Sequence, residues 1–255
     1  MPAVVLVPVL LLAGAACAGS SPEETATTET TLGGPVLTVC SDIPYEPFVY
    51  GDPSQPEGFE VDLVEAVGTS LDRPVTFRST PYDQLAPTLT AGGCDLAASA
   101  IPVTDTGEMA FSTPYLDVDM AVLVRTADAA ALSSVEALAG HQVGVVSDTP
   151  SADVFAGVAP ADAVVQGFVT VDDAVAALRA GTVDAVVADA PVVDHLVLDD
   201  PTTEVAVRVP TGTRYGFGLA PTNATLLAEV DQALAALSAD GTLTALTTRW
   251  FGPTG

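Results

Sequence analysis

GFEVDLVEAVGTSL, residues 58–71, predicts an amphipathic helix. Its apolar side chains recur at helical spacing and would form one broad face; they are Phe59, Val61, Leu63, Val64, Val67 and Leu71. We expect the acids Glu60, Asp62 and Glu65 to occupy the other side and the first turns, where acids complement the positive end of the helix dipole. Taken alone, the stretch is the first helix of an α/β domain.

The N-terminal segment predicts export. An apolar run over residues 4–12 leads through small residues to Cys17. The run is too short to span a bilayer and has the size of the apolar region of a signal peptide, which we place at residues 1–17. The small residues before Cys17 resemble a lipobox, which implies that this cysteine is lipidated. A plain secretory signal is the alternative, because no Lys or Arg precedes the run and Gly14 stands where a lipobox usually has Leu.

Residues 18–35 are rich in Ser, Thr, Glu and Gly and predict a disordered tether. About 220 residues follow, a size that suits two lobes. Seven basic residues against 33 acids give a net charge of −26, which repels nucleic acid and anionic lipid and therefore argues against a nucleic-acid partner. The same charge would concentrate a cationic ligand at low salt, although solubility alone explains so acidic a surface.

Residues 36–40 predict a short apolar strand, and two prolines fix the loop that follows it. We expect Asp42 and Tyr45 to be held at the carboxyl end of this strand, where open α/β sheets bind ligands. A core aromatic in a turn is the alternative for Tyr45. Further strands are expected at residues 75–77 and 94–99, with a helix over residues 81–91 between them, so the strands should be parallel neighbours.

Cys40 and Cys94 are the two cysteines of the expected folded part, and export favours a disulfide between them. Cys40 lies near the end of its predicted strand, whereas Cys94 lies near the start of its own. In parallel neighbours this offset could exceed the Cα separation of about 7 Å that a disulfide tolerates. The sequence leaves the pairing open.

These motifs resemble, in order, the bacterial extracellular solute-binding proteins of family 3, the polar amino-acid and opine receptors of ABC importers. The family's first helix reads G-aromatic-acid-aliphatic-acid-aliphatic, and its first strand is followed by D-x-x-Y-x-P-F. The resemblance covers residues 37–252 and implies the type II periplasmic-binding-protein fold, with two α/β lobes, two crossover segments and a ligand cleft between the lobes. Lobe 1 should comprise residues 36–115 and 216–255, and lobe 2 with both crossings residues 116–215. We expect Trp250 and Phe251 to dock the last helix onto lobe 1.

The resemblance also implies a ligand site built from both lobes. Asp42 would line its floor, Tyr45 and Tyr82 would stack on the ligand, and Asp189, in the block VDAVVADAPV, would receive the ligand's ammonium. The full expected ligand-binding set is Asp42, Tyr45, Tyr82, Ser99, Ala100, Pro102, Thr149, Ser151 and Asp189. Helix capping is the alternative for Thr149 and Asp189.

Residues 100–107, AIPVTDTG, depart from the family pattern G-x-T-x-T-x-x-R. The Arg that forks the ligand's α-carboxylate in the family is Gly107 here, and the first Thr, whose backbone N–H assists, is Pro102. Loss of a bidentate clamp removes one of the stronger polar contacts that a site can offer. Either the ligand is an amine or polar solute without an α-carboxylate, or Arg78 or Arg214 replaces the clamp. The intact remainder of the pocket pattern favours amino-acid-like binding with a displaced anchor.

The function implied by the resemblance is that of a non-enzymatic receptor. It would close on a small polar solute, an amino acid or a related amine, and present it to an ABC permease as a monomer without metal or cofactor. We expect it at the extracytoplasmic face of the membrane, anchored through Cys17. A dehydratase-type enzyme and a ligand sensor are the alternatives. His141 and His195 lie in no motif with a nucleophile or a metal-ligand spacing, which favours the receptor.

Overall fold

The computed structural model describes residues 1, 3, 32–147 and 149–253. The fold belongs to the unit Leu32–Gly255. The predicted signal peptide, the lipidation of Cys17 and most of the predicted tether lie outside the described residues. Among the residues described, no helix has the length and apolar character needed to cross a membrane.

The first sheet has the strand order β4-β1-β5-β12-β6. Its strands are β1 (Leu37–Ser41), β4 (Val75–Ser79), β5 (Leu96–Ala97), β6 (Ala110–Phe111) and β12 (Gly218–Leu219). β1 pairs in parallel with β4 and β5, whereas β12 returns from late in the chain and pairs antiparallel with β5 and β6. The accompanying elements are the hairpin β2 (Tyr50–Asp52) and β3 (Gln55–Glu57), the helices α1 (Phe59–Ser70), α2 (Leu85–Thr90), α6 (Ala224–Ala239) and α7 (Thr242–Phe251), and the 3-10 turn η1 (Tyr82–Gln84). We call this assembly lobe 1.

The second sheet has the strand order β11-β7-β10-β8-β9. Its strands are β7 (Leu116–Arg125), β8 (Gln142–Val146), β9 (Val164–Phe168), β10 (Ala185–Asp189) and β11 (Thr203–Tyr215). β8, β9 and β10 run parallel, so the helices that follow them all begin at the same edge of the sheet. These helices are α3 (Pro150–Val158), α4 (Val171–Ala180) and α5 (Ala190–Asp199). We call this assembly lobe 2.

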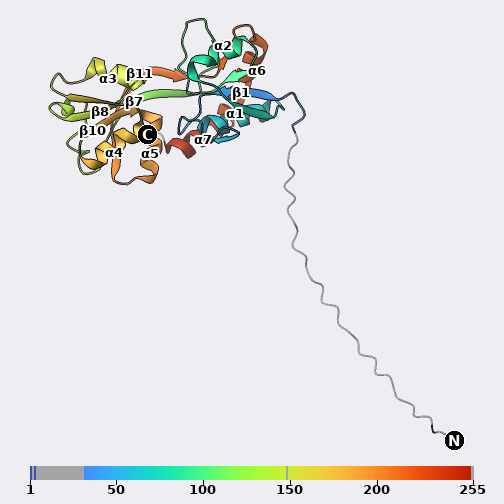
Figure 1. Ribbon diagram of the computed structural model, residues 1–255, viewed down its shortest axis with the longest axis horizontal. Helices are drawn as coiled ribbons and strands as arrows, with labels where there is room; N and C mark the ends of the chain where they lie inside the picture. Colours follow the sequence, from blue (N-terminus) through green and yellow to red (C-terminus); the bar gives the residue numbers. More distant parts are fainter. Residues whose placement is uncertain (2, 4–31, 148, 254–255) are drawn as a thin grey trace. The chain divides into compact units, whose positions relative to one another are not determined.

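β7 and β11 carry the chain between the lobes. They pair antiparallel along their length, from Leu116 opposite Tyr215 to Arg125 opposite Thr203, and lie side by side in Figure 1. β7 is apolar on both faces because Met120, Val122 and Val124 enter one core cluster while Ala121 and Leu123 enter another. Two α/β lobes joined by two paired crossings confirm the predicted fold class.

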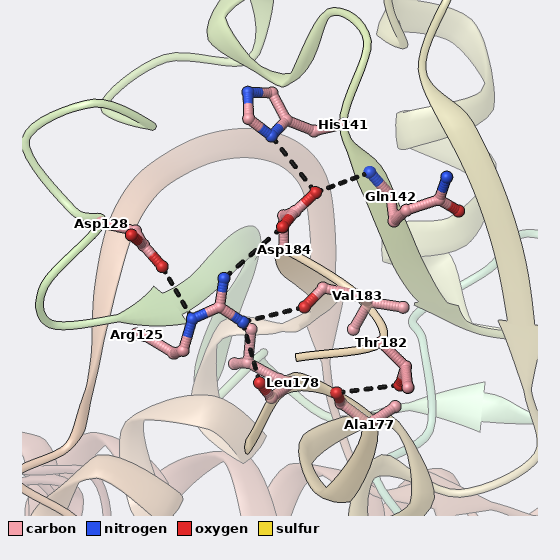
Figure 2. Close-up of polar contacts among 9 residues, drawn as sticks. All are labelled: Arg125, Asp128, His141, Gln142, Ala177, Leu178, Thr182, Val183 and Asp184. Carbon is pink, nitrogen blue, oxygen red and sulfur yellow. Dashed lines mark hydrogen bonds and ion pairs between the residues drawn. The ribbon is translucent and has the colours of Figure 1, made fainter. Parts of the chain in front are cut away.

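The end of lobe 2 opposite its helix starts is fixed by a polar cluster, shown in Figure 2. The Arg125 guanidinium donates to Asp128 at 2.7 Å and to the carbonyl oxygens of Leu178 and Val183 at 2.8 and 2.9 Å. Asp184, which precedes β10, accepts from the backbone N–H of Gln142 at 3.0 Å. The Arg125 guanidinium therefore uses its N–H donors within the fold, where it joins strand ends to the end of a helix.

Several elements differ from the sequence expectation. The predicted strand over residues 94–99 shortens to β5, and Cys94 lies in the turn before it. Cys40 and Cys94 form a disulfide with a Cα–Cα distance of 5.9 Å, because this turn brings Cys94 back toward β1. Between β7 and β8 the chain forms a 3-10 turn, η2 (Glu136–Leu138). The docking of the last helix is confirmed, since Trp250 Nε1 donates to Asp62 of α1 at 2.8 Å and both Trp250 and Phe251 lie in the core of lobe 1.

Candidate functional site

Asp189 is a nearly inaccessible carboxylate at the carboxyl end of β10. Its side chain accepts hydrogen bonds from the backbone N–H and hydroxyl of Ser151, at 3.2 and 2.5 Å, and from the Tyr215 hydroxyl at 3.1 Å. Only 1% of Asp189 is exposed, and burial raises the pKa of this carboxyl above its ordinary value despite these hydrogen bonds. Ser151 lies in the first turn of α3 and Tyr215 ends β11, so the acid is oriented by both a helix start and a crossing strand.

A pocket of about 600 Å³ lies beside Asp189, between the two lobes. Lobe 1 contributes residues 44–47 together with Tyr50 and Gly51, all from the segment between β1 and β3. Lobe 2 contributes the region where α3, α4 and α5 begin, including Thr149, Thr170 and Asp189. Because parallel strands place these helix starts at one edge, the pocket has the position expected of a ligand cleft in an α/β fold.

Tyr45 lines the pocket from lobe 1. Its ring stacks on Phe48 with centroids 5.4 Å apart, and Phe48 is fully buried, so the loop that carries Tyr45 is anchored in the core. Burial, followed by the negative charges of Asp189 and Glu60, raises the pKa of Tyr45. This tyrosine therefore offers a neutral aromatic wall beside a carboxylate.

Asp42, Ser99 and Tyr82 come together in lobe 1 but do not line this pocket. The backbone N–H of Asp42 donates to Ser99 Oγ at 3.1 Å, and the Asp42 carboxylate accepts from the backbone N–H of Tyr82 at 3.1 Å. Tyr82 is 49% exposed. The expected pairing of Tyr45 and Tyr82 around a ligand stays a prediction.

Glu60 organises the loop after β5, and the sequence expectation that it occupies the outer side of its helix is wrong. It is fully buried, and its carboxylate accepts from the Ala100 backbone N–H at 2.9 and 3.0 Å and from the Tyr115 hydroxyl. Ala100 has a left-handed φ of 47°, a conformation that few non-glycine residues adopt. The signal was present in the spacing, since Glu60 lies three, four and seven residues before the buried Leu63, Val64 and Val67.

Pro102, Thr149 and the two arginine candidates have other partners in the structure. Pro102 forms a backbone bridge with Tyr215. Thr149 caps α3 by accepting from the Ala152 N–H at 3.2 Å, and it also lines the pocket. Arg78 donates to the carbonyl oxygen of Gly93 at 3.1 Å, at the end of α2. Arg214 is exposed on β11, next to Tyr215, and neither arginine is among the residues that line the pocket.

Sequence reasoning missed Glu46, Asp172 and His195, which line the pocket from the lobe 1 loop, the first turn of α4 and the middle of α5. His195 Nδ1 donates to the carbonyl oxygen of Trp250 at 2.8 Å, and its Nε2 lies 3.7 Å from Glu46. No local motif marks these residues, because they meet only when the lobes are assembled. The acid in the first turn of α4 follows a capping threonine, which has a purely local explanation.

The sequence profile of the bacterial extracellular solute-binding proteins, family 3, matches residues 37–253. The chain belongs to this family. Among curated relatives, it is similar to ABC transporter arginine-binding protein 1 of Escherichia coli (strain K12), with 28% identity over 81% of this chain and 87% of the relative. It is also similar to a probable histidine-binding protein of Neisseria gonorrhoeae, with 29% identity over 82% of this chain and 79% of the relative.

Solved structures of family members share the fold. An ancestral cationic amino acid solute-binding protein superposes with a TM-score of 0.77 and 28% identity, over 85% of this chain and 95% of the other. An ancestral arginine-binding protein bound to arginine gives a TM-score of 0.67 and 29% identity, over 87% of this chain and 100% of the other. As a family member, the chain thus combines the family's two-lobed fold with a cleft that carries Asp189.

Proposed function

We propose that this protein is the extracytoplasmic substrate-binding component of an ABC importer and that it closes on a small, positively charged polar solute. Membership of family 3 supports the receptor role, and the relatives described as arginine-binding and histidine-binding proteins support a cationic solute. A membrane permease would then receive the solute. The lipidation of Cys17 and a monomeric state, without nucleic acid or cofactor, complete the proposal.

The pocket beside Asp189 is the observation that carries it. A carboxylate has about four lone-pair sites, and the bonds from Ser151 and Tyr215 leave capacity for a ligand N–H donor. Tyr45 lines the same pocket and would supply an aromatic face, to which a cation is attracted. Since the pocket has walls from both lobes, a bound solute would favour their approach.

Binding without turnover is part of the proposal. A second solved structure of the same ancestral cationic amino acid solute-binding protein, with 28% identity and a TM-score of 0.68, describes that protein as a precursor of cyclohexadienyl dehydratase. Conversion of the solute would therefore contradict binding without turnover. The relatives from Escherichia coli and Neisseria gonorrhoeae are named as binding proteins, which favours the receptor.

A panel of cationic amino acids and amines tests the proposal. At 100 times its dissociation constant, a true ligand should raise the free energy of unfolding by about 2.7 kcal/mol, which thermal shift detects. Calorimetry should then show that Tyr45→Ala weakens this ligand at least tenfold while Val165→Ala, at an exposed position on β9, leaves it unchanged. Chromatography should recover the solute unaltered. Conversion of the solute, or the absence of binding by every compound of the panel, would overturn the proposal.

A further inference from the structure

The acids of the pocket bear on the chemical class of the solute. Glu46, Asp172 and Asp189 line the pocket, and no arginine is among its lining residues. His195 is the one basic side chain among the lining residues. Its Nε2 lies 3.7 Å from Glu46 Oε1, so the imidazole already faces a carboxylate. The pocket therefore has a negative field, which attracts cations and repels carboxylates.

Several N–H donors at the starts of α3 and α4, which face the pocket, are already bound to the chain's own oxygens. In α3, the Ser151 N–H donates to Asp189 and the Ala152 N–H donates to Thr149. In α4, the Asp173 N–H donates to Thr170 at 3.2 Å, and two aspartates occupy the first turn. α5 begins after Asp189, and its first turn contains Pro191, which has no N–H. These bonds use part of the donor capacity of α3 and α4, and the two aspartates of α4 oppose an anion at that helix start.

Lobe 1 uses its loop donors in the same way. The Ala100 N–H is bound to the Glu60 carboxylate. Pro102 has no N–H, and its backbone is paired with Tyr215. Gly107 has no side chain, and its φ of 79° would strain any larger residue. In the loop where family 3 members are expected to hold a carboxylate, Ala100 and Pro102 thus offer no free backbone N–H, and Gly107 offers no side-chain donor.

The arginines are placed elsewhere. All seven basic residues of the chain are arginines in the described part, and six of them donate hydrogen bonds to other residues there. One of them, Arg125, donates to Asp128 and to the carbonyl oxygens of Leu178 and Val183 (Figure 2). Arg214 is the seventh. Its neighbour Tyr215 reaches Asp189, and because successive side chains of a strand point to opposite faces, Arg214 points away from that acid.

From these positions we propose that the solute is an organic cation without an α-carboxylate, an amine or a guanidine; this inference rests on the proposed function. The sequence alone favoured an amino acid held by a displaced arginine, but Arg78 and Arg214 lie outside the pocket lining. A carboxylate bound beside Asp189 would lose its water without gaining an arginine as a partner, whereas a cation gains the acids and the ring of Tyr45. The pocket thus selects against the group that an amino acid carries next to its ammonium.

Matched pairs of ligands test this inference. Calorimetry on the full folded chain would compare arginine with agmatine, lysine with cadaverine, and histidine with histamine, each amino acid against its decarboxylated amine. In the pair that binds best, the amine should bind at least tenfold more tightly. Equal or tighter binding of the amino acid would overturn the inference while leaving the proposed function intact. Failure of all six compounds to bind would overturn the proposed function and the inference together.

A variant series identifies the cause of the discrimination. Asp172→Asn should weaken the amine several-fold, and Asp172→Arg should raise the affinity of the amino acid relative to its amine, because it adds the missing cation at the pocket. Glu204→Gln, at an exposed acid on β11 outside the pocket lining, is the matched control and should leave both affinities unchanged. An amine-to-amino-acid ratio that is the same in the wild type and in Asp172→Arg would contradict the electrostatic origin.

Discussion

Glu60 is a carboxyl group whose burial has a measurable cost. It is fully buried and is bound by the Ala100 N–H and the Tyr115 hydroxyl. Burial raises the pKa of Glu60 from 4.5 to about 7, against the lowering effect of these two hydrogen bonds. A carboxylate in this position holds the left-handed Ala100 and the residue that precedes β7, so it links the loop after β5 to the start of a crossing strand.

This pKa predicts a pH-dependent stability. The folded protein binds the Glu60 proton more tightly than the unfolded chain, so the contribution is full below about pH 4.5 and is lost as the pH rises toward about 7. The loss is on the order of 3 kcal/mol. Urea unfolding at about pH 5 and about pH 7.5 should show that Glu60→Gln removes this part of the slope, whereas the exposed Glu204→Gln retains it. Identical slopes for Glu60→Gln and the wild type would refute the assignment.

At the scale of elements, α7 connects the two lobes through its last turn. Trp250 Nε1 and the Arg249 guanidinium both donate to the same oxygen of Asp62 in α1, at 2.8 and 2.9 Å. The carbonyl oxygen of Trp250 accepts from His195 of α5 in lobe 2. A carbonyl can only accept, so His195 carries a proton on Nδ1. The helix thus fixes α1 on one side and α5 on the other.

The two donors to Asp62 should contribute differently to the free energy of unfolding. The Trp250 hydrogen bond is shielded in the core, so Trp250→Phe should lower the free energy of unfolding by about 2 kcal/mol. Arg249 has a side chain that is 66% exposed, and Arg249→Gln should cost less than about 1 kcal/mol because water screens the pair. Urea unfolding of the two variants compares them directly. The opposite order would show that the ion pair, rather than the indole, holds α7.

Elements with a strong local pattern were predictable from sequence. The helix predicted over residues 58–71 is α1, and the strand predicted over residues 36–40 is β1, because helical spacing and a short apolar strand are visible in short windows. The conformation of the loop after β5 was not predictable from sequence, since the left-handed Ala100 depends on Glu60, which is 40 residues away. Within the site, the positions of Tyr45 and Asp189 followed from family motifs, whereas Glu46 and His195 reach the pocket only through packing between lobes.

At the scale of the whole molecule, Tyr215 connects the two lobes at the pocket. Its backbone pairs with Pro102 and accepts from the N–H of Tyr115, both on the lobe 1 side. Its hydroxyl donates to Asp189 in lobe 2. Burial, followed by the charge of Asp189, raises the pKa of this tyrosine, so it stays protonated and keeps donating. The residue that orients the acid is therefore also part of the joint between the lobes.

The irregular pairing of β11 has a mechanical consequence. Between Val209 and Thr213, four residue steps on β11 face two on β7, and Thr211 fills the gap through its hydroxyl, which donates to the carbonyl oxygen of Val118 and accepts from the N–H of Thr213. The regular strand pairing on either side is stiff, so we expect the chain to bend mainly between Val209 and Thr213. The two lobes should then rotate about this point as rigid bodies. Distances between spin labels introduced at the exposed positions 54, 69 and 162 measure this rotation. Ligand should shorten the distance between labels 54 and 162 and leave the distance between labels 54 and 69 unchanged. Thr211→Val should broaden the distribution of the 54–162 distance in the free protein. A ligand-dependent change in 54–69 would mean that lobe 1 deforms, and that the closing motion has no single axis.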